Sequence, residues 1–136
     1  NGAETHRTMA GNFLADSFGA SVQHIALATD DIFATSAAMA EKGFKPLPMS
    51  DNYYADLAAR FSLSDDMLAR LKAGNILYDE DAAGAFFQYY SRPYASGMFF
   101  EIVERRDGHK GYGGPNAPFR IAAQKRLMRP KGMPKQ

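Results

Sequence analysis

Residues 97–106 read GMFFEIVERR, and the rest of the chain is interpreted outward from this segment. Aromatic and β-branched residues dominate it, which is typical of a β-strand. Because side chains alternate between the two faces of a strand, Phe99, Glu101 and Val103 share one face. An ionised carboxylate among apolar neighbours is costly unless a cation pairs with it. The segment therefore predicts a strand whose acid, Glu101, faces a metal ion or an arginine.

The composition is that of one globular domain or part of one. The chain has 136 residues, of which 46% are hydrophobic and 23% charged. The net charge is +1, so no strong field recruits nucleic acid or a membrane surface. No apolar run approaches the roughly 18 residues of a membrane span, and no signal peptide opens the chain. Cysteine is absent, which removes thiolate metal sites and fits a reducing compartment, so we expect a cytoplasmic protein.

Hydrophobic periodicity and capping residues predict a mixture of strands and helices. Ser62 or Ser64 is expected to cap the helix at 65–72. The pattern indicates an α+β fold with a curved, mostly antiparallel sheet, helices on its convex face and a C-terminal capping helix. The expected strands cover residues 22–29, 75–78, 85–91 and 97–106, with a short extended piece at 44–47, and the expected helices cover 32–42, 52–61, 65–72 and 117–128.

The first expected strand supplies a histidine. His24, Ala26 and Ala28 share one of its faces, and the two small alanines leave room for a ligand above the imidazole. Ile25 and Leu27 lie on the opposite face, which is expected to pack against a helix. This strand therefore predicts an open surface around His24.

His24 and Glu101 together suit a divalent metal. They lie on the first and last strands of the unit, and curling of the sheet could bring them together. Imidazole and carboxylate ligands suit Fe, Mn, Co or Zn, and two histidines with one carboxylate suit ferrous oxygenases. The pair alone leaves a second reading open, in which His24 is a hydrogen-bonded core residue.

Gln88 and its aromatic neighbours are candidate binding residues. Phe86, Gln88 and Tyr90 share one face of a strand, and a glutamine there must satisfy both halves of its amide. It either orients a ligand oxygen or bonds to the backbone. Tyr90 and Phe99 would form the walls for a flat substrate, with simple core packing as the alternative for Phe99.

The glycine-rich segment 108–115, GHKGYGGP, lacks the residue order of a phosphate-binding loop. We interpret it as a hinge before a lid helix. Its histidine, His109, is expected to be exposed.

Several ordered segments together resemble 4-hydroxyphenylpyruvate dioxygenase. They are far more specific than the histidine–glutamate pair, and they span most of the chain. The matching segments are 22–27 (VQHIAL), the tyrosine pair 53–54, 74–79 (GNILYD), 86–93 (FFQYYSRP), 98–106 (MFFEIVERR) and 111–116 (GYGGPN).

The resemblance implies a module of the vicinal-oxygen-chelate (glyoxalase/dioxygenase) superfamily, whose members pair βαβββ modules. It implies that His24 and Glu101 are two of three Fe(II) ligands and that the third, a histidine, belongs to a preceding module. Asn1 is not an initiator methionine, so we expect a piece of a longer protein. Residues 1–21 are expected to lead in from the preceding module, 22–116 to form the dioxygenase-like module, and 117–136 to form a capping helix and a basic tail. The resemblance also implies substrate-binding roles for Gln88, Tyr90, Phe99 and Asn116.

One departure suggests a different parent protein. The dioxygenase has Gly-Asn-Phe where this chain has Pro115, Asn116 and Ala117, so the phenylalanine that covers the aromatic ring is missing. The local sequence NAPFR resembles the dioxygenase-like C-terminal half of bacterial 3-dehydroshikimate dehydratases, in which a separate barrel domain performs the dehydration.

The sequence thus predicts part of an Fe(II)-dependent oxygenase acting on a 2-oxo acid, or on another aromatic or cyclic acid. The alternatives are a metal-binding module of a bifunctional dehydratase and a non-catalytic small-molecule binding module. The isolated chain is expected to be inactive unless self-association supplies a further histidine. A homo-oligomer is expected, and neither a nucleic acid nor a membrane partner is.

Overall fold

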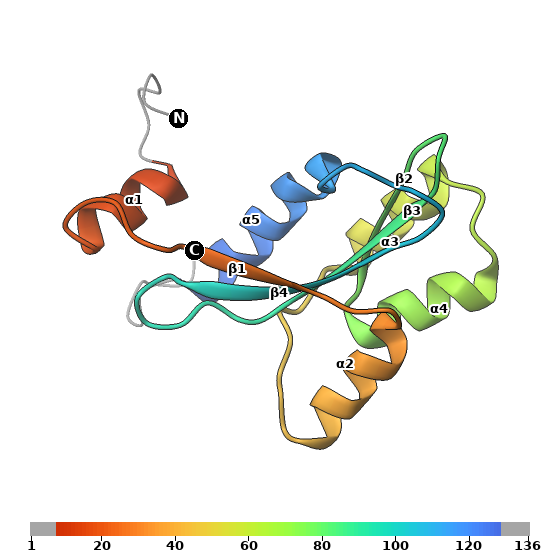
Figure 1. Cartoon of the computed structure of the whole chain (residues 1–136), viewed down its shortest axis with the longest axis horizontal. Coiled ribbons are helices and arrows are strands. Elements are labelled where there is room, and N and C mark those ends of the chain that lie inside the picture. Colours follow the sequence, from red (N-terminus) through yellow and green to blue (C-terminus); the bar gives the residue numbers. More distant parts are fainter. Residues whose placement is uncertain (1–7, 129–136) are drawn as a thin grey trace, which may run out of the picture.

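A computed structural model describes residues 8–128 of the chain (Figure 1). The first residues of the expected lead-in and the end of the expected basic tail lie outside this range. No helix among residues 8–128 is long and apolar enough to cross a bilayer. In chain order the elements are α1 (Met9–Asp16), β1 (His24–Ala28), α2 (Ile32–Glu41), α3 (Asp51–Arg60), α4 (Asp65–Gly74), β2 (Leu77–Glu80), β3 (Ala85–Tyr90), β4 (Phe99–Arg105), the 3-10 turn η1 (Gly114–Asn116) and α5 (Ala117–Leu127).

The strands form one sheet in the order β1-β4-β3-β2. β1 runs parallel to β4, and the other two pairs are antiparallel. Ala26 lies opposite Glu101 in the β1–β4 ladder, and Tyr90 lies opposite Glu101 in the β3–β4 ladder. The expected α+β fold and mostly antiparallel sheet are confirmed. The first and last strands need no curled sheet to meet, because they are direct neighbours.

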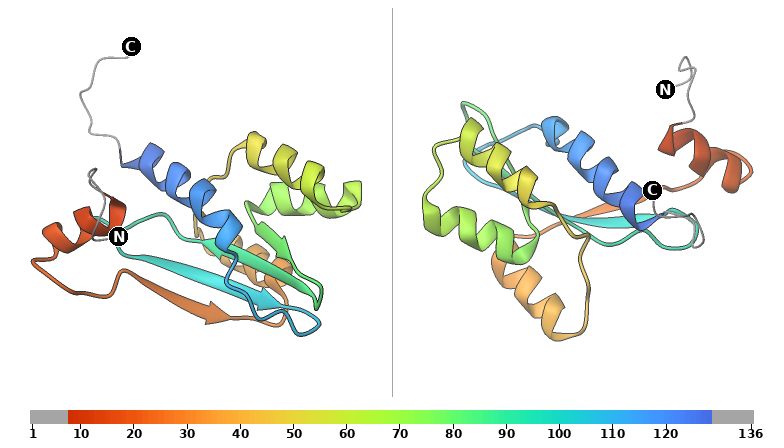
Figure 2. Two further views of the ribbon diagram at one scale, coloured as in Figure 1. Left: turned by 90° about the horizontal axis from the view of Figure 1, so that it is seen from above. Right: turned by 180° about the vertical axis from the view of Figure 1, so that it is seen from behind.

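Helices lie on both sides of the sheet (Figures 1 and 2). α2 covers one face, where Phe33 packs edge-to-face against Phe87 with ring centroids 5.8 Å apart. Tyr89 and Ile102 are buried on the same face. α5 lies over the other face, as expected of a capping helix, and α3 and α4 pack beside β2.

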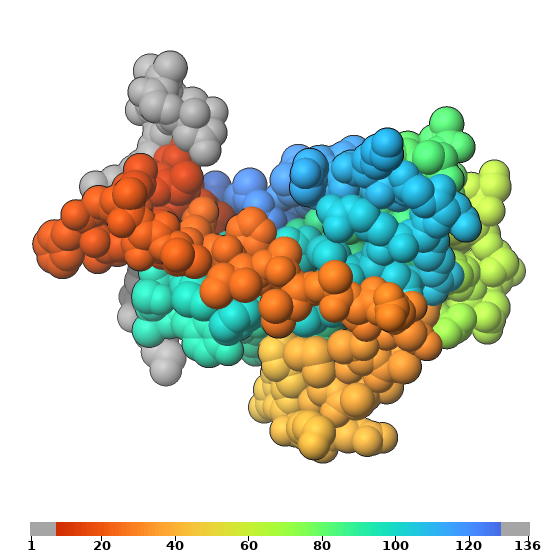
Figure 3. All heavy atoms as spheres, in the orientation of Figure 1, coloured from red at the N-terminus to blue at the C-terminus, as the bar shows by residue number. Residues whose placement is uncertain are grey.

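β1 is an exposed edge strand. All five of its residues are exposed, and it crosses the outside of the molecule (Figure 3). Ile25 and Leu27 are 41% and 52% exposed, so the expectation that they pack against a helix is wrong for this chain. The reason is geometric, because the main sheet contacts of α2 are with β3 and β4 and not with β1. Among residues 8–128, no strand pairs with the outer edge of β1.

The helices begin where short polar side chains accept backbone hydrogen bonds. Asp31 accepts from the backbone N–H of Ala34 at 3.0 Å and begins α2. Ser64 accepts from the N–H of Met67 at 3.1 Å and begins α4, which decides between the two expected caps.

Ser64→Ala is expected to lower the free energy of unfolding by about 1 kcal/mol, because the first turn of α4 loses its acceptor. Ser62→Ala is the matched control, since Ser62 is also exposed and forms no cap of this helix. We expect the control to change stability by less than about 0.5 kcal/mol. Urea denaturation of both variants measures the difference, and equal losses would contradict the assignment.

Candidate functional site

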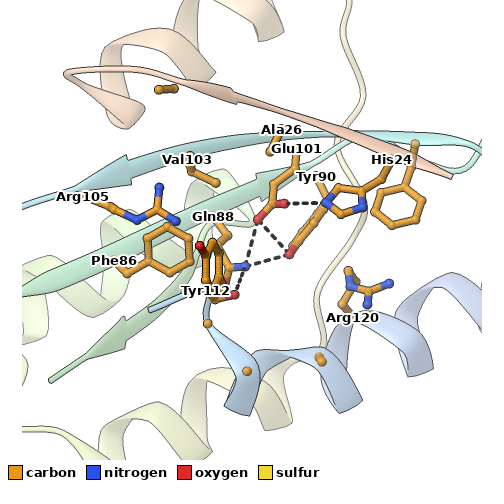
Figure 4. Close-up of a pocket in the computed structure, with 15 residues that line it drawn as sticks. His24, Ala26, Phe86, Gln88, Tyr90, Glu101, Val103, Arg105, Tyr112 and Arg120 are labelled. Atoms are coloured by element: carbon orange, nitrogen blue, oxygen red, sulfur yellow. Dashed lines mark hydrogen bonds and ion pairs between the residues drawn. The ribbon is translucent and has the colours of Figure 1, made fainter. Parts of the chain in front are cut away.

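His24 and Glu101 meet on one face of the sheet (Figure 4). The distance from His24 Nε2 to Glu101 Oε2 is 3.2 Å. The carboxylate side chain is only 8% exposed, whereas the imidazole is 46% exposed. The His24 ring stacks on Phe99, with centroids 5.1 Å apart and planes 9° apart. The two predicted ligand residues therefore converge as expected, with the acid in the core and the imidazole at an open edge.

The second oxygen of Glu101 is held by two donors. Its Oε1 accepts from Gln88 Nε2 at 2.9 Å and from the Tyr90 hydroxyl at 3.0 Å. Burial raises the pKa of Tyr90 far above its usual range, and the Glu101 carboxylate raises it further. Tyr90 is therefore a neutral phenol that donates a hydrogen bond to the carboxylate. These two bonds fix the acid so that Oε2 is the oxygen that faces His24.

The pair has the geometry of two neighbouring ligands of one cation. Two ligands at right angles, each about 2.1 Å from a metal, lie about 3 Å apart. The separation of 3.2 Å between the two side chains agrees with this value. No group of three or more His, Cys, Asp or Glu side chains suited to a metal occurs in the described part of the chain. Residues 8–128 thus supply two side chains that could hold a metal, and no third His, Cys, Asp or Glu joins them in this part of the chain.

Gln88 uses both halves of its amide inside the protein. Its Nε2 also lies 2.7 Å from the Tyr90 hydroxyl, and its Oε1 accepts from Asn116 Nδ2 at 2.7 Å. Asn116 is itself 1% exposed and accepts from the Tyr53 hydroxyl at 2.9 Å. The structure therefore places Asn116 behind Gln88 and not on the wall of the cavity. A direct substrate contact by Gln88 stays a prediction: Nε2 is engaged with Tyr90 and Glu101, and Oε1 retains one lone pair.

The glycine-rich loop packs tightly against Gln88. Gly113 has a positive φ of 64°, and a Cβ atom at this position would collide with the Gln88 amide. The loop is therefore closely packed at Gly113, and its role as a hinge stays a prediction. His109 is 4% exposed and stacks on Phe86 at 5.1 Å, so the expectation that it is exposed is wrong. Its Nε2 lies 3.5 Å from the Asp81 carboxylate, a contact between the loop and the β2–β3 turn.

A cavity of about 620 Å³ lies over this face of the sheet. Ala26 and Ala28 line it, in agreement with the space expected above the first strand. Aromatic rings form its walls, and residues of α5 lie on the opposite side (Figure 4). The predicted site residues that line it are His24, Gln88, Tyr90, Phe99 and Glu101.

Among the lining residues that were not predicted from the sequence, three have large polar or aromatic side chains: Arg105, Tyr112 and Arg120. The Arg120 guanidinium lies 5.2 Å from the centre of the Phe99 ring and donates from Nη1 to Gln124 Oε1 at 2.9 Å. Gln124 is fully buried, and its Nε2 has no partner among the described residues. An unsatisfied buried donor costs about 1–3 kcal/mol. The positions 117, 120 and 124, which recur along one face of a helix, were the signal that could have found Arg120.

No protein-family model matches the chain. It is 42% identical over 130 residues to a 3-dehydroshikimate dehydratase of Pseudomonas aeruginosa, covering 95% of this chain and 20% of that protein. It is 33% identical over 106 residues to a 4-hydroxyphenylpyruvate dioxygenase of the same species, covering 76% of this chain and 29% of the dioxygenase. Among solved structures, a fusion of a xylose isomerase-like TIM barrel with 4-hydroxyphenylpyruvate dioxygenase superposes with a TM-score of 0.76 at 43% identity, covering 80% of this chain and 18% of the fusion. The chain is a 4-hydroxyphenylpyruvate dioxygenase-like module.

The dioxygenase-like module is also similar to a mutant 4-hydroxymandelate synthase from Streptomyces coelicolor, with a TM-score of 0.75 at 30% identity over 88% of this chain and 34% of the synthase. These structures share the vicinal-oxygen-chelate fold expected from the sequence. The dioxygenase-like module spans about a fifth of the dehydratases and about 30% of the dioxygenases that it matches.

Proposed function

We propose that this dioxygenase-like module forms half of a divalent-metal site in a larger protein. His24 Nε2 and Glu101 Oε2 would hold the cation, with Fe(II) as the expected metal and Mn, Co or Zn as alternatives. The observation that carries the proposal is the 3.2 Å approach of these two atoms, one of which belongs to a buried carboxylate. Bound iron would supply the coordination of a 2-oxo acid and the activation of O₂.

The surrounding residues would orient the ligands and exclude water. Gln88 and Tyr90 hold Glu101 by hydrogen bonds, and Phe99 supports the His24 ring from one face. Phe86 and Phe99 provide apolar walls for a flat substrate. The aromatic or cyclic part of an acid would lie between these walls, with its oxygens toward His24.

We further propose that a preceding module completes the site at β1. His24 is half exposed, and Ile25 and Leu27 beside it present apolar surface to solvent. The free edge of β1 offers unpaired backbone groups to a neighbouring unit. A histidine from that unit would occupy the open side of the metal. Self-association of this chain is the alternative source of the missing ligand.

A second function has its own support. The identity to the dehydratase extends over 95% of this chain, more than the 76% matched by the dioxygenase. Ala117 lines the cavity at the position where the dioxygenase motif has its covering phenylalanine. Both observations favour the C-terminal module of a bifunctional 3-dehydroshikimate dehydratase, in which another domain performs the dehydration. A non-catalytic small-molecule binding module is the third candidate.

O₂ uptake by the whole protein distinguishes these functions. The protein that contains this chain and its preceding sequence is loaded with Fe(II) and supplied with 4-hydroxyphenylpyruvate, phenylpyruvate or other 2-oxo acids. For an oxygenase, we expect uptake that Glu101→Ala abolishes. For the dehydratase module, we expect no uptake and a dehydration rate that Glu101→Ala leaves unchanged. Uptake that persists in the variant would contradict the assigned ligands.

A further inference from the structure

Arg120 is a cation at the wall of a mostly apolar cavity. Its guanidinium lies over the rings of Phe99 and Tyr90, at 5.2 and 5.8 Å from their centres (Figure 4). Within residues 8–128 it has no carboxylate within salt-bridge distance, and its one hydrogen bond goes to Gln124. A partly desolvated charge without a counterion is energetically unfavourable, so this arrangement points to an anionic ligand.

Gln124 holds the guanidinium in its place. An arginine only donates hydrogen bonds, so the amide oxygen of Gln124 has to face Arg120. The amide nitrogen is then left buried without a partner in the described part of the chain. The fold therefore gives up a hydrogen bond in order to orient Arg120. This orientation leaves most of the guanidinium N–H groups available to a ligand.

The position of Arg120 defines where the anion would lie. The Phe99 ring contacts both partners, because the His24 imidazole stacks on it at 5.1 Å and the guanidinium lies at 5.2 Å. His24 and Arg120 are thus both direct neighbours of the Phe99 ring and line the same cavity. Ala117, three residues before Arg120 on the same helical face, adds little bulk to this side of the cavity. The cavity of about 620 Å³ is large enough for a small ring.

We propose that Arg120 binds a carboxylate carried by a small cyclic ligand, away from the oxygens that face His24 and Glu101. The inference rests on the proposed function in that both place the ligand in this cavity. A site of this kind would bind ring acids more tightly than neutral rings of the same size. Arg105 is not assigned this role, because it is exposed at another part of the wall and donates to the Gly111 carbonyl at 3.1 Å.

Benzoate and benzamide are the test ligands, since they share a ring and differ in charge. Their dissociation constants are measured by ligand-observed NMR with the full chain in the presence of a chelator. We expect benzoate to bind at least about tenfold more tightly than benzamide. Arg120→Leu should reduce this preference to about one, and Arg120→Lys should retain part of it. Arg126→Leu is the matched control, because Arg126 is exposed near the end of the same helix, and it should keep the preference.

Equal affinities in the unmodified chain, or a preference that survives Arg120→Leu, would overturn the inference. Loss of the preference in Arg126→Leu as well would also overturn it, because the effect would then follow net charge. Metal content is measured separately on the protein that contains the preceding module, with Glu101→Ala as reference. If metal binding fails while the benzoate preference holds, the proposed metal site is wrong and the role of Arg120 stands.

Discussion

Glu101→Ala is expected to weaken divalent-metal binding by about 100-fold or more, as measured by competition with a chelator in the protein that contains the preceding module. Loss of an orienting partner alone costs about 10–100-fold in metal affinity, so loss of a ligand should cost at least the upper value. Glu101 would supply one of the two proposed ligand atoms of residues 8–128, and its Oε2 lies 3.2 Å from His24 Nε2. His24→Ala should have an effect of the same order.

The matched control for this substitution is Glu41→Ala. Glu41 is the last residue of α2, it is exposed, and it lines no part of the cavity. Glu41→Ala removes the same charge without changing the site, so the metal affinity of this variant should equal that of the unmodified protein. Circular dichroism verifies that each variant is folded, because Glu101→Ala also removes an acceptor from Gln88 and Tyr90. Undiminished affinity in a folded Glu101→Ala protein would refute the metal site.

Gly113→Ala is expected to lower the free energy of unfolding by about 2–4 kcal/mol. One part of the loss is backbone strain, because Gly113 has a φ of 64°. The other part is a collision, because the new methyl group would overlap the Gln88 amide, which is 2% exposed. Guanidinium denaturation measures the loss, and displacement of Gln88 should also weaken metal binding through Glu101.

Gly108→Ala separates the two causes. Gly108 has a φ of 86°, but no atom lies within 4 Å of the position that its Cβ would take. It therefore carries the backbone strain without the collision, and we expect a loss of only about 1–2 kcal/mol. If both variants lose the same stability, packing of Gly113 against Gln88 has no measurable role.

Most helices and strands were predictable because their signals are local, although α1 was not among the expected helices. Ser64 and Asp31 stand at the beginning of their helices, and alternation in residues 97–106 places Glu101 on the face where it is found. The orientation of Glu101 was not predictable, because it depends on the side chains of Gln88 and Tyr90. The sequence motif identified Glu101, Gln88 and Tyr90 as site residues, but it did not specify the hydrogen bonds among them.

The errors concern contacts between elements that are distant in sequence. His109 is buried because the loop folds back on Phe86, which no local pattern records. Arg120 reaches the cavity only because α5 lies over the sheet. Ile25 and Leu27 carry the pattern of a covered strand, and among residues 8–128 no helix covers them. Their pattern is consistent with a surface that another module covers.

The unequal burial of the two candidate ligands has a kinetic consequence. Glu101 is fixed in the core, whereas His24 belongs to a strand that is joined to the sheet along one edge only. β1 can thus fray without loosening the packing between α2 and β3, and each opening would carry the imidazole away from the carboxylate. A cation bound by both side chains would cross-link β1 to β4. The rate of metal release would then be limited by the rate at which β1 separates from β4.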